Sequence, residues 1–226
     1  MKILLDTANL AEIEEIIQYY PIDGFTTNPT ILSRDSSDVP ATLRRLMEIS
    51  GGKMEIHVQV TAAESEGMLA QAKALDKFVG KGFHIKIPVT PEGIRAMTLC
   101  KKAGIRVTAT SIFTPMQALL AAKAGADYVA PYVNSIDNMQ CDGPGVVSEI
   151  LTLFENFGYP TKMLAAGFDS VSQVLGVALA GAHTVTVTAS IMHKLLFHPH
   201  TDLAVGNFAA DWKAKFGAQS VSDLLK

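Results

Sequence analysis

Short apolar runs rich in β-branched residues recur along the whole chain, and segments with helical periodicity lie between them. Runs of this kind are typical of strands that are buried on both faces of a parallel sheet. The predicted strands are residues 2–7, 24–29, 55–61, 84–90, 106–112, 128–133, 162–168 and 184–190.

The segment after the first strand shows how the helices are signalled. Asn9 can cap a helix, Glu12 stands at the capping-box position, and Pro21 ends the pattern. The apolar residues of one predicted helix face are Leu10, Ile13, Ile16, Ile17 and Tyr20.

Three later helical segments end on the same Ala-Gly pair, and a strand follows within a few residues. Each glycine is expected in the left-handed conformation that commonly follows a helix. They are Gly104, Gly125 and Gly181.

Alternating strands and helices predict a parallel sheet covered by helices. Eight such units within about 200 residues predict a (β/α)8 TIM barrel. A doubly wound sheet is the alternative, but it calls for a glycine-rich turn after the first strand. The residues from Asp6 to Asn9 contain no glycine there.

We expect two parts, with residues 1–200 forming the catalytic barrel domain and residues 201–226 forming an extra C-terminal helix. Phe208, Trp212 and Phe216 lie at helical spacing in this second part.

Composition narrows the class of protein. Of the 226 residues, 48% are hydrophobic, and the net charge of −3 comes without basic or acidic runs. Neither nucleic acid nor a membrane is therefore expected as a partner. No signal peptide or membrane-spanning segment is evident, which predicts a cytoplasmic protein. Cys100 and Cys141 lack metal-ligand spacing, the six histidines form no convincing set, and no metal is expected.

Lys86 stands in the middle of the apolar run His84–Thr90. Burial in a sheet disfavours a charged ammonium unless it is paired. A neutral amine attacks carbonyl carbon and forms a Schiff base. The alternative is a lysine on an edge strand whose ammonium reaches water.

Other polar residues stand near the C-terminal ends of the predicted strands, where TIM barrels carry their chemistry. Strand alternation permits five of them to face the same interior: Asp6, Asn28, Gln59, Lys86 and Thr110. Thr26, Tyr132, Gly167 and Asp169 lie near the same ends. Each has a structural alternative: Asp6 can simply pair with Lys86, Asn28-Pro29 can be a turn, and Tyr132 can be a core aromatic.

These residues and their surroundings resemble the small-subunit transaldolase family, and within it the fructose 6-phosphate aldolase branch. The matching motifs span nearly the whole chain. They are Leu5–Asn9, Thr26–Thr30, Val58–Val60, Lys86–Thr90 with Glu92-Gly93, Thr110, Ala124–Asn134 and Leu164–Ala166.

The resemblance implies a role for each matching position. Lys86 is the Schiff-base lysine, and Asp6 binds donor hydroxyls and assists proton transfer. Thr26 and Asn28 hold the dihydroxyacetone part. The residues that position the catalytic water and move the proton are Gln59, Thr110 and Tyr132. Transaldolases usually have Glu and Phe at positions 59 and 132, so this chain has the aldolase pair.

The chain departs from the family where the sugar phosphate is bound. Ser135 replaces a usual arginine, Gly167 a usual serine, and Asp169 a usual basic residue. Phosphate recognition relies on arginine or dense donors. A neutral acceptor is therefore expected, or an anion bound elsewhere, with Arg34 the first candidate.

The sequence thus predicts a class I aldolase acting on a ketose and an aldehyde through a dihydroxyacetone unit. The resemblance implies no cofactor and a homo-oligomer, a pentamer or decamer, in which the C-terminal helix reaches a neighbour. The alternatives are a transaldolase and a non-catalytic, sugar-binding barrel.

Overall fold

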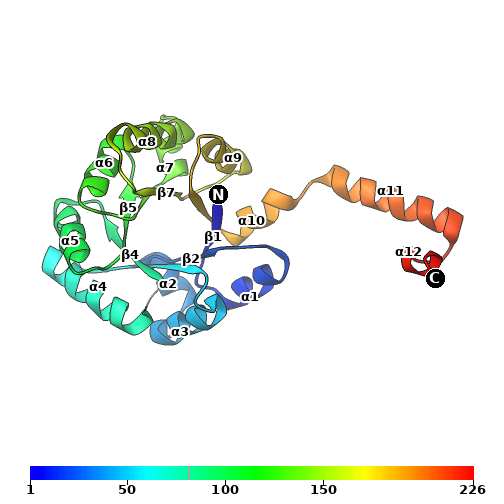
Figure 1. Ribbon diagram of the computed structural model, residues 1–226, viewed down its shortest axis with the longest axis horizontal. Helices are drawn as coiled ribbons and strands as arrows, with labels where there is room; N and C mark the ends of the chain where they lie inside the picture. The colour runs from blue at the N-terminus through cyan, green and yellow to red at the C-terminus, as the bar shows by residue number, and fades with distance from the viewer. Residues whose placement is uncertain (81) are drawn as a thin grey trace. The chain divides into compact units, whose positions relative to one another are not determined.

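The computed structural model describes residues 1–80 and 82–226, and within them it confirms the predicted barrel. Parallel strands close in chain order, and the last pairs with the first (Figure 1). They are β1 (Lys2–Asp6), β2 (Gly24–Thr26), β3 (Glu55–Gln59), β4 (Phe83–Pro88), β5 (Val107–Ile112), β6 (Tyr128–Pro131), β7 (Lys162–Ala165) and β8 (Thr184–Val187).

Helices follow each strand, and those from α1 to α9 surround the ring of strands (Figure 1). They are α1 (Leu10–Tyr19), α2 (Pro29–Asp35), α3 (Val39–Ser50), α4 (Ser65–Val79), α5 (Pro91–Lys102), α6 (Pro115–Lys123), α7 (Val133–Asn138), α8 (Gly143–Phe157), α9 (Val171–Leu179), α10 (Ala189–Leu196), α11 (Pro199–Phe216) and α12 (Val221–Leu224).

The predicted helix ends are largely correct. The Asn9 side chain accepts from the backbone N–H groups of Ala11 and Glu12 and caps α1. The expected capping box is wrong, because the Glu12 carboxylate accepts instead from the Thr7 hydroxyl at 3.0 Å. The three predicted C-terminal glycines do have positive φ: Gly104 at 73°, Gly125 at 95° and Gly181 at 96°.

Most predicted strands extend too far at their C-terminal ends. The strand of residues 24–29 ends at Thr26, and Asn28 caps α2 instead. The strand of residues 128–133 ends at Pro131, and Tyr132 occupies the position before α7. In both places the backbone turns at the end of the strand to begin the next helix, and the Asn28 side chain caps that helix.

Side chains inside the barrel change in character along its axis. Near the N-terminal ends of the strands, Lys2, Glu55, His57 and His84 form a polar group. An apolar layer lies across the middle, made of Leu4, Tyr128, Ala130 and Leu164. The C-terminal ends carry the second polar group, in which Lys86 lies. The Thr108 hydroxyl, on the residue that pairs with Lys86 in the register, lies 2.8 Å from Nδ1 of His57, so the two polar groups approach each other on this side of the barrel.

The chain divides into two compact units, Met1–Ile191 and Met192–Lys226. The second contains α11, where the predicted helix is confirmed, and α12. In this unit the Trp212 ring lies 4.5 Å from that of Phe216, and its Nε1–H donates to the Gln219 carbonyl at 2.7 Å. Among the described residues, no helix is both long and apolar enough to cross a membrane.

Candidate active site

Lys86 is buried in β4, with 5% of its surface exposed. β4 has β3 on one side and β5 on the other, so the edge-strand alternative is wrong. The ammonium group donates to the Thr27 carbonyl at 2.9 Å. Among the described residues, no carboxylate lies within 4.0 Å of it, so the proposed pair with Asp6 does not form. A buried amine without a carboxylate partner is the form that nucleophilic catalysis needs.

Asp6 ends β1 and is held by a threonine relay. The Thr26 hydroxyl donates to Oδ1 of Asp6 at 2.6 Å, and it also lies within hydrogen-bond distance of the Thr186 hydroxyl. A hydroxyl has one proton to donate, so Thr186 must be the donor to Thr26. Asp6 is therefore kept as an oriented acceptor that faces the interior.

Gln59 ends β3 directly beside Lys86 in the sheet register. Its Oε1 is buried and has no hydrogen-bond partner among the described residues. Buried polar atoms are rarely left unpaired in a native protein. An acceptor in this position, next to the amine, suits a substrate hydroxyl or a water molecule.

Thr110 and Tyr132, the residues expected to move the proton, lie together. Their hydroxyl oxygens lie 3.0 Å apart, and the Tyr132 ring packs edge-on against Phe113 with centroids 5.7 Å apart. The β5–β6 register shifts between Ala109 and Ile112, and Ser111 has φ of 61°. A bulge of this kind redirects neighbouring side chains, and bulges are common beside active sites.

Asn28 follows the end of β2, as a helix cap rather than as the strand residue that was predicted. It lies after β2, and its side-chain oxygen accepts from the Ile31 N–H at 2.9 Å. Capping therefore occupies the oxygen, and the amide N–H groups remain as donors.

The residues expected at the acceptor end lie on two neighbouring loops. The Asn134 N–H donates to the Gly167 carbonyl at 2.8 Å, which places α7 and Ser135 beside the β7–α9 loop. Gly167 has φ of 67°, so a serine there would be strained. Asp169 is exposed, and no described residue bonds to its carboxylate. The structure thus brings Ser135 and Gly167 together, while the Asp169 side chain stands apart.

Arg34, the other candidate for anion binding, already has a partner. Its guanidinium forms two hydrogen bonds to the Asp35 carboxylate, at 2.6 and 2.9 Å. This pairing raises the pKa of Arg34 and lowers the pKa of Asp35, and the Asp6 charge also acts on Arg34. A paired guanidinium binds a second anion less strongly than a free one.

Three features of the site have no role assigned from the sequence, although Thr186 is among the polar residues at the end of the eighth predicted strand. Thr186 stands in a Thr-Val-Thr-Val run whose alternation places it inward, so the pattern could have identified it. The Thr27 carbonyl and the Phe113 ring carry no sequence signal of their role. Within residues 1–80 and 82–226, no group of three or more His, Cys, Asp and Glu residues could hold a metal ion.

Known proteins match the chain over nearly its full length. A family model described as Transaldolase/Fructose-6-phosphate aldolase matches residues 3–223. A "Probable transaldolase" of Geobacter sulfurreducens is 39% identical over 95% of this chain and 99% of its own length. A "Probable fructose-6-phosphate aldolase" of Streptococcus pneumoniae is 39% identical over 94% of this chain and 96% of its own.

A solved structure described as "Native KDPGal structure" has a TM-score of 0.58 and 14% sequence identity, and covers 83% of this chain and 81% of its own. That likeness supports the barrel fold alone. The family match and the two relatives reach further, and they confirm the resemblance noted in the sequence. The chain therefore belongs to the transaldolase/fructose-6-phosphate aldolase family of enzymes.

Proposed function

We propose that this enzyme is a class I aldolase that cleaves or forms the C3–C4 bond of a ketose through a Schiff base on Lys86. The observation that carries the proposal is the buried Lys86 amine, which bonds to a backbone carbonyl and has no carboxylate partner among the described residues. Such an amine is released to attack a carbonyl carbon when substrate displaces its hydrogen bond.

The reaction begins when Nζ of Lys86 attacks C2 of the ketose, and loss of water gives an iminium. The Tyr132 hydroxyl, 3.0 Å from the Thr110 hydroxyl, takes the proton of the C4 hydroxyl as it passes its own proton to a water molecule held by Gln59 and Thr110, and this proton later returns to C3. The C3–C4 bond breaks, its electron pair moves into the iminium, and the aldehyde departs. The resulting enamine is protonated at C3, and water added at C2 releases dihydroxyacetone and the free amine.

The donor part of the substrate is held by the groups at the ends of β1 and β2. The Asp6 carboxylate accepts from a donor hydroxyl, while the Thr26 and Thr186 hydroxyls keep that carboxylate oriented. The free amide N–H groups of Asn28 donate to the same part of the substrate. The bond to the Asp6 carboxylate is charge-assisted, and such hydrogen bonds are stronger than those between two neutral groups.

Transaldolase is the second candidate, because the relatives of this chain include a probable transaldolase as well as a probable fructose-6-phosphate aldolase. Gln59 and Tyr132 favour the aldolase, because a tyrosine hydroxyl acts directly as acid and base and the resemblance associates this pair with the aldolase branch. The test compares turnover with free dihydroxyacetone and with a ketose donor. Strict dependence on both a ketose donor and an acceptor aldehyde would identify a transaldolase.

The acceptor end supports a neutral aldehyde. Ser135 offers a hydroxyl and no charge, Gly167 offers no side chain, and Arg34 is paired with Asp35. An exposed carboxylate at Asp169 would repel a dianion that approached it, by an amount that solvent screening limits.

The C-terminal unit supports the proposal of a homo-oligomer. No residue of α11 is buried, and its apolar side chains include Leu203, 59% exposed, and Phe208, 71% exposed. Apolar surface of this kind marks an interaction site, and we propose that a neighbouring subunit covers it, in a pentamer or decamer. Sedimentation of the full chain would test this, and a monomer at working concentrations would refute it.

Trapping of the Schiff base tests the main proposal. The protein is incubated with dihydroxyacetone and borohydride, and peptide mapping by mass spectrometry should place the reduced adduct on Lys86. Lys86→Met, which replaces the amine by an apolar chain of similar length, should fold and give neither adduct nor turnover. Lys123→Met, at an exposed position on α6, is the matched control and should retain both. An adduct on another lysine, or none, would refute the assignment.

A further inference from the structure

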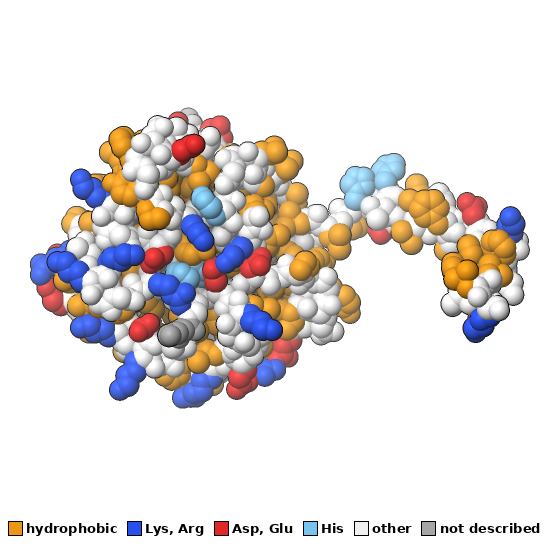
Figure 2. All heavy atoms as spheres, in the orientation of Figure 1, with side chains coloured by type: hydrophobic (Ala, Val, Ile, Leu, Met, Phe, Trp, Pro, Cys, Tyr) orange, Lys and Arg blue, Asp and Glu red, His pale blue; other side chains and the backbone are white. Residues whose placement is uncertain are grey.

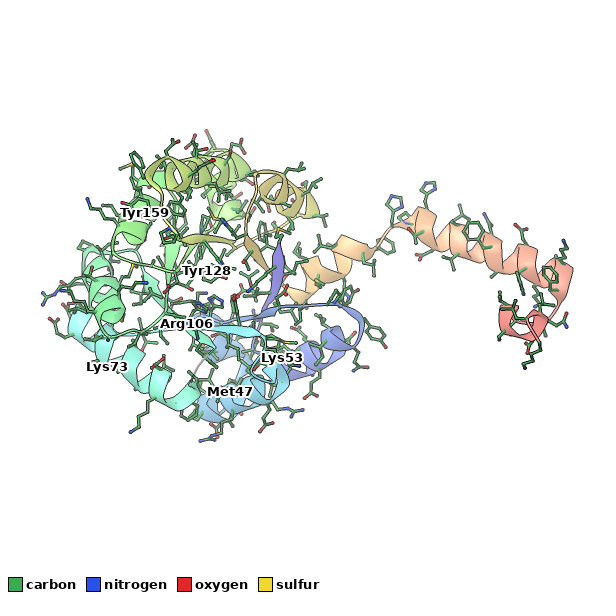
Figure 3. All side chains as sticks on the ribbon, in the orientation of Figure 1. Met47, Lys53, Lys73, Arg106, Tyr128 and Tyr159 are labelled. Carbon is green, nitrogen blue, oxygen red and sulfur yellow. The ribbon has the colours of Figure 1, made fainter. Side chains whose placement is uncertain are left out.

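A second polar pocket opens at the opposite end of the barrel from Lys86. It is a cavity of about 460 Å³ between the starts of β3 to β7. Figure 2 shows Lys and Arg side chains gathered with acidic ones and a histidine near the centre of the barrel. Figure 3 shows Arg106 and Tyr128 near the centre of the ring of strands. This end of a TIM barrel ordinarily serves stability, so a polar cavity there needs an explanation.

Buried polar side chains line the inner part of the pocket. His84 and Tyr128 are 4% and 3% exposed, and His84 stacks on His57 with ring centroids 4.6 Å apart. Nδ1 of His84 is buried and has no hydrogen-bond partner among the described residues. An unpaired ring nitrogen is costly in a finished core, whereas it suits the wall of a binding site.

The charges of the pocket do not balance. Its carboxylates are Glu55 and Asp127, and each has a cation: Lys2 lies 2.6 Å from Glu55, and Lys101 lies 3.5 Å from Asp127. The Val107 N–H also donates to Asp127 at 2.8 Å.

The two remaining cations of the pocket are Arg106 and Lys162. No carboxylate oxygen of a described residue lies within 4.0 Å of either one. Both are exposed, and they line the same pocket as the buried His84. The paired carboxylates are neutralised, so these two side chains leave the pocket with a positive excess.

We propose that this pocket binds a small phosphate dianion, either inorganic phosphate or the phosphate group of a monoester. The Arg106 guanidinium provides a planar pair of donors for two phosphate oxygens, and the Lys162 ammonium provides a second positive charge. The buried wall with His84 and Tyr128 excludes water from one side of the anion and strengthens these contacts.

The composition of the pocket also excludes other ligand classes. A cavity of about 460 Å³ has room for a phosphate monoester but not for a nucleic acid. The cations likewise disfavour a divalent metal ion.

The proposal is tested by calorimetric titration of the full-length protein with inorganic phosphate at constant ionic strength. Saturable binding is expected in the unmodified protein, together with a rise in melting temperature that follows the occupancy of the site. Arg106→Ala with Lys162→Ala should weaken binding by at least about tenfold, equivalent to roughly 1.4 kcal/mol. The matched control, Lys73→Ala with Lys77→Ala, removes the same charge from exposed positions of α4 and should bind as the unmodified protein does.

Two further measurements keep the test decisive. If the double variant fails to fold by circular dichroism, Arg106→Gln and Lys162→Gln are measured singly, and each should weaken binding. Phosphate should also shift the ring resonances of His84 in the nuclear magnetic resonance spectrum. Equal affinity in the unmodified protein and the Arg106 and Lys162 variants would overturn the proposal, because phosphate would then bind elsewhere. Absence of saturable binding would overturn it as well.

Discussion

The stacked histidines near the N-terminal end of the barrel should make the protein lose stability as the pH falls below about 6.5. Burial lowers the pKa of His84 from 6.5 to about 3, and the charges of His57 and Arg106 add to the effect. Burial also lowers the pKa of His57, although Glu55 opposes this. Both rings are therefore neutral in the native protein at pH values where an exposed histidine is charged.

The sign follows from proton uptake. In the unfolded chain both histidines titrate near 6.5, while in the native state His84 stays neutral down to about 3. Between these values the unfolded state binds more protons, so the free energy of unfolding decreases as the pH falls. Above about 6.5 neither state is protonated, and these groups contribute no slope.

The magnitude is about 1 kcal/mol per pH unit for a group that titrates only on unfolding, as His84 does in this range, and His57 adds a slope of the same sign. Glu55 contributes only at lower pH. Burial raises its pKa, but His57 and Lys2 outweigh burial and hold the pKa below its usual 4.5. Glu55 therefore adds no slope in the window from pH 6.5 to 4.5, whereas His183, whose pKa is also lowered by burial, adds a slope of the same sign as the stacked pair. The charged and titratable groups around the pair are Lys2, Glu55, Lys86, Arg106 and Tyr128.

The assay is urea unfolding followed by circular dichroism across this window, at fixed protein concentration and in buffers free of phosphate. His84→Gln removes one of the two groups and should reduce the slope by about 1 kcal/mol per pH unit. His200→Gln, at an exposed position on α11, is the control and should leave the slope unchanged. A flat profile in the unmodified protein, or an unchanged slope in His84→Gln, would refute the reasoning.

Three further outcomes are expected. Tyr132→Phe keeps the ring but removes the hydroxyl, so kcat for cleavage should fall roughly 10²–10⁴-fold while borohydride trapping persists; an unchanged kcat would exclude this hydroxyl as the acid/base. Ser135→Arg with Asp169→Lys should raise the kcat/KM ratio of glyceraldehyde 3-phosphate over glyceraldehyde at least about tenfold, and a strong preference for the ester in the unmodified protein would contradict the neutral acceptor. Iodoacetamide near neutral pH should alkylate the exposed Cys141 and spare Cys100, because burial raises the pKa of the Cys100 thiol to about 11; equal labelling of both peptides by mass spectrometry would contradict this.

The order and type of the strands and helices were determined by the sequence alone. Strand-like runs separated by segments of helical periodicity predict the barrel, because the spacing of the apolar residues shows which faces of each strand or helix are buried. The helix-ending glycines, Gly104, Gly125 and Gly181, were predictable for the same local reason, since a left-handed residue after a helix costs least in glycine. Lys86 was also evident, because a cation inside an apolar strand conflicts with its surroundings.

Where the strands stop was decided by backbone geometry that propensity does not encode. Tyr132 suits an extended strand, and Asn28-Pro29 is compatible with a turn, yet in the structure each of Asn28 and Tyr132 directly precedes a helix. The bulge in β5, with Ser111 at positive φ, likewise has no signal in a residue type that is common in strands and loops alike. The placement of Thr110 against Tyr132 therefore emerges only in the folded chain.

The closure of the barrel determined which residues from distant parts of the sequence meet in the structure. Thr26 and Thr186 are 160 residues apart in sequence, and they meet because β8 pairs with β1 beside β2. His57, His84 and Tyr128 each looked like an isolated residue of its own strand, and only the register of β3 to β6 brings their rings together. Periodicity tells which face of a strand is inward, but it carries no information on which distant residue shares that height in the barrel. That is fixed by strand pairing and stagger, which depend on the packing of the whole chain.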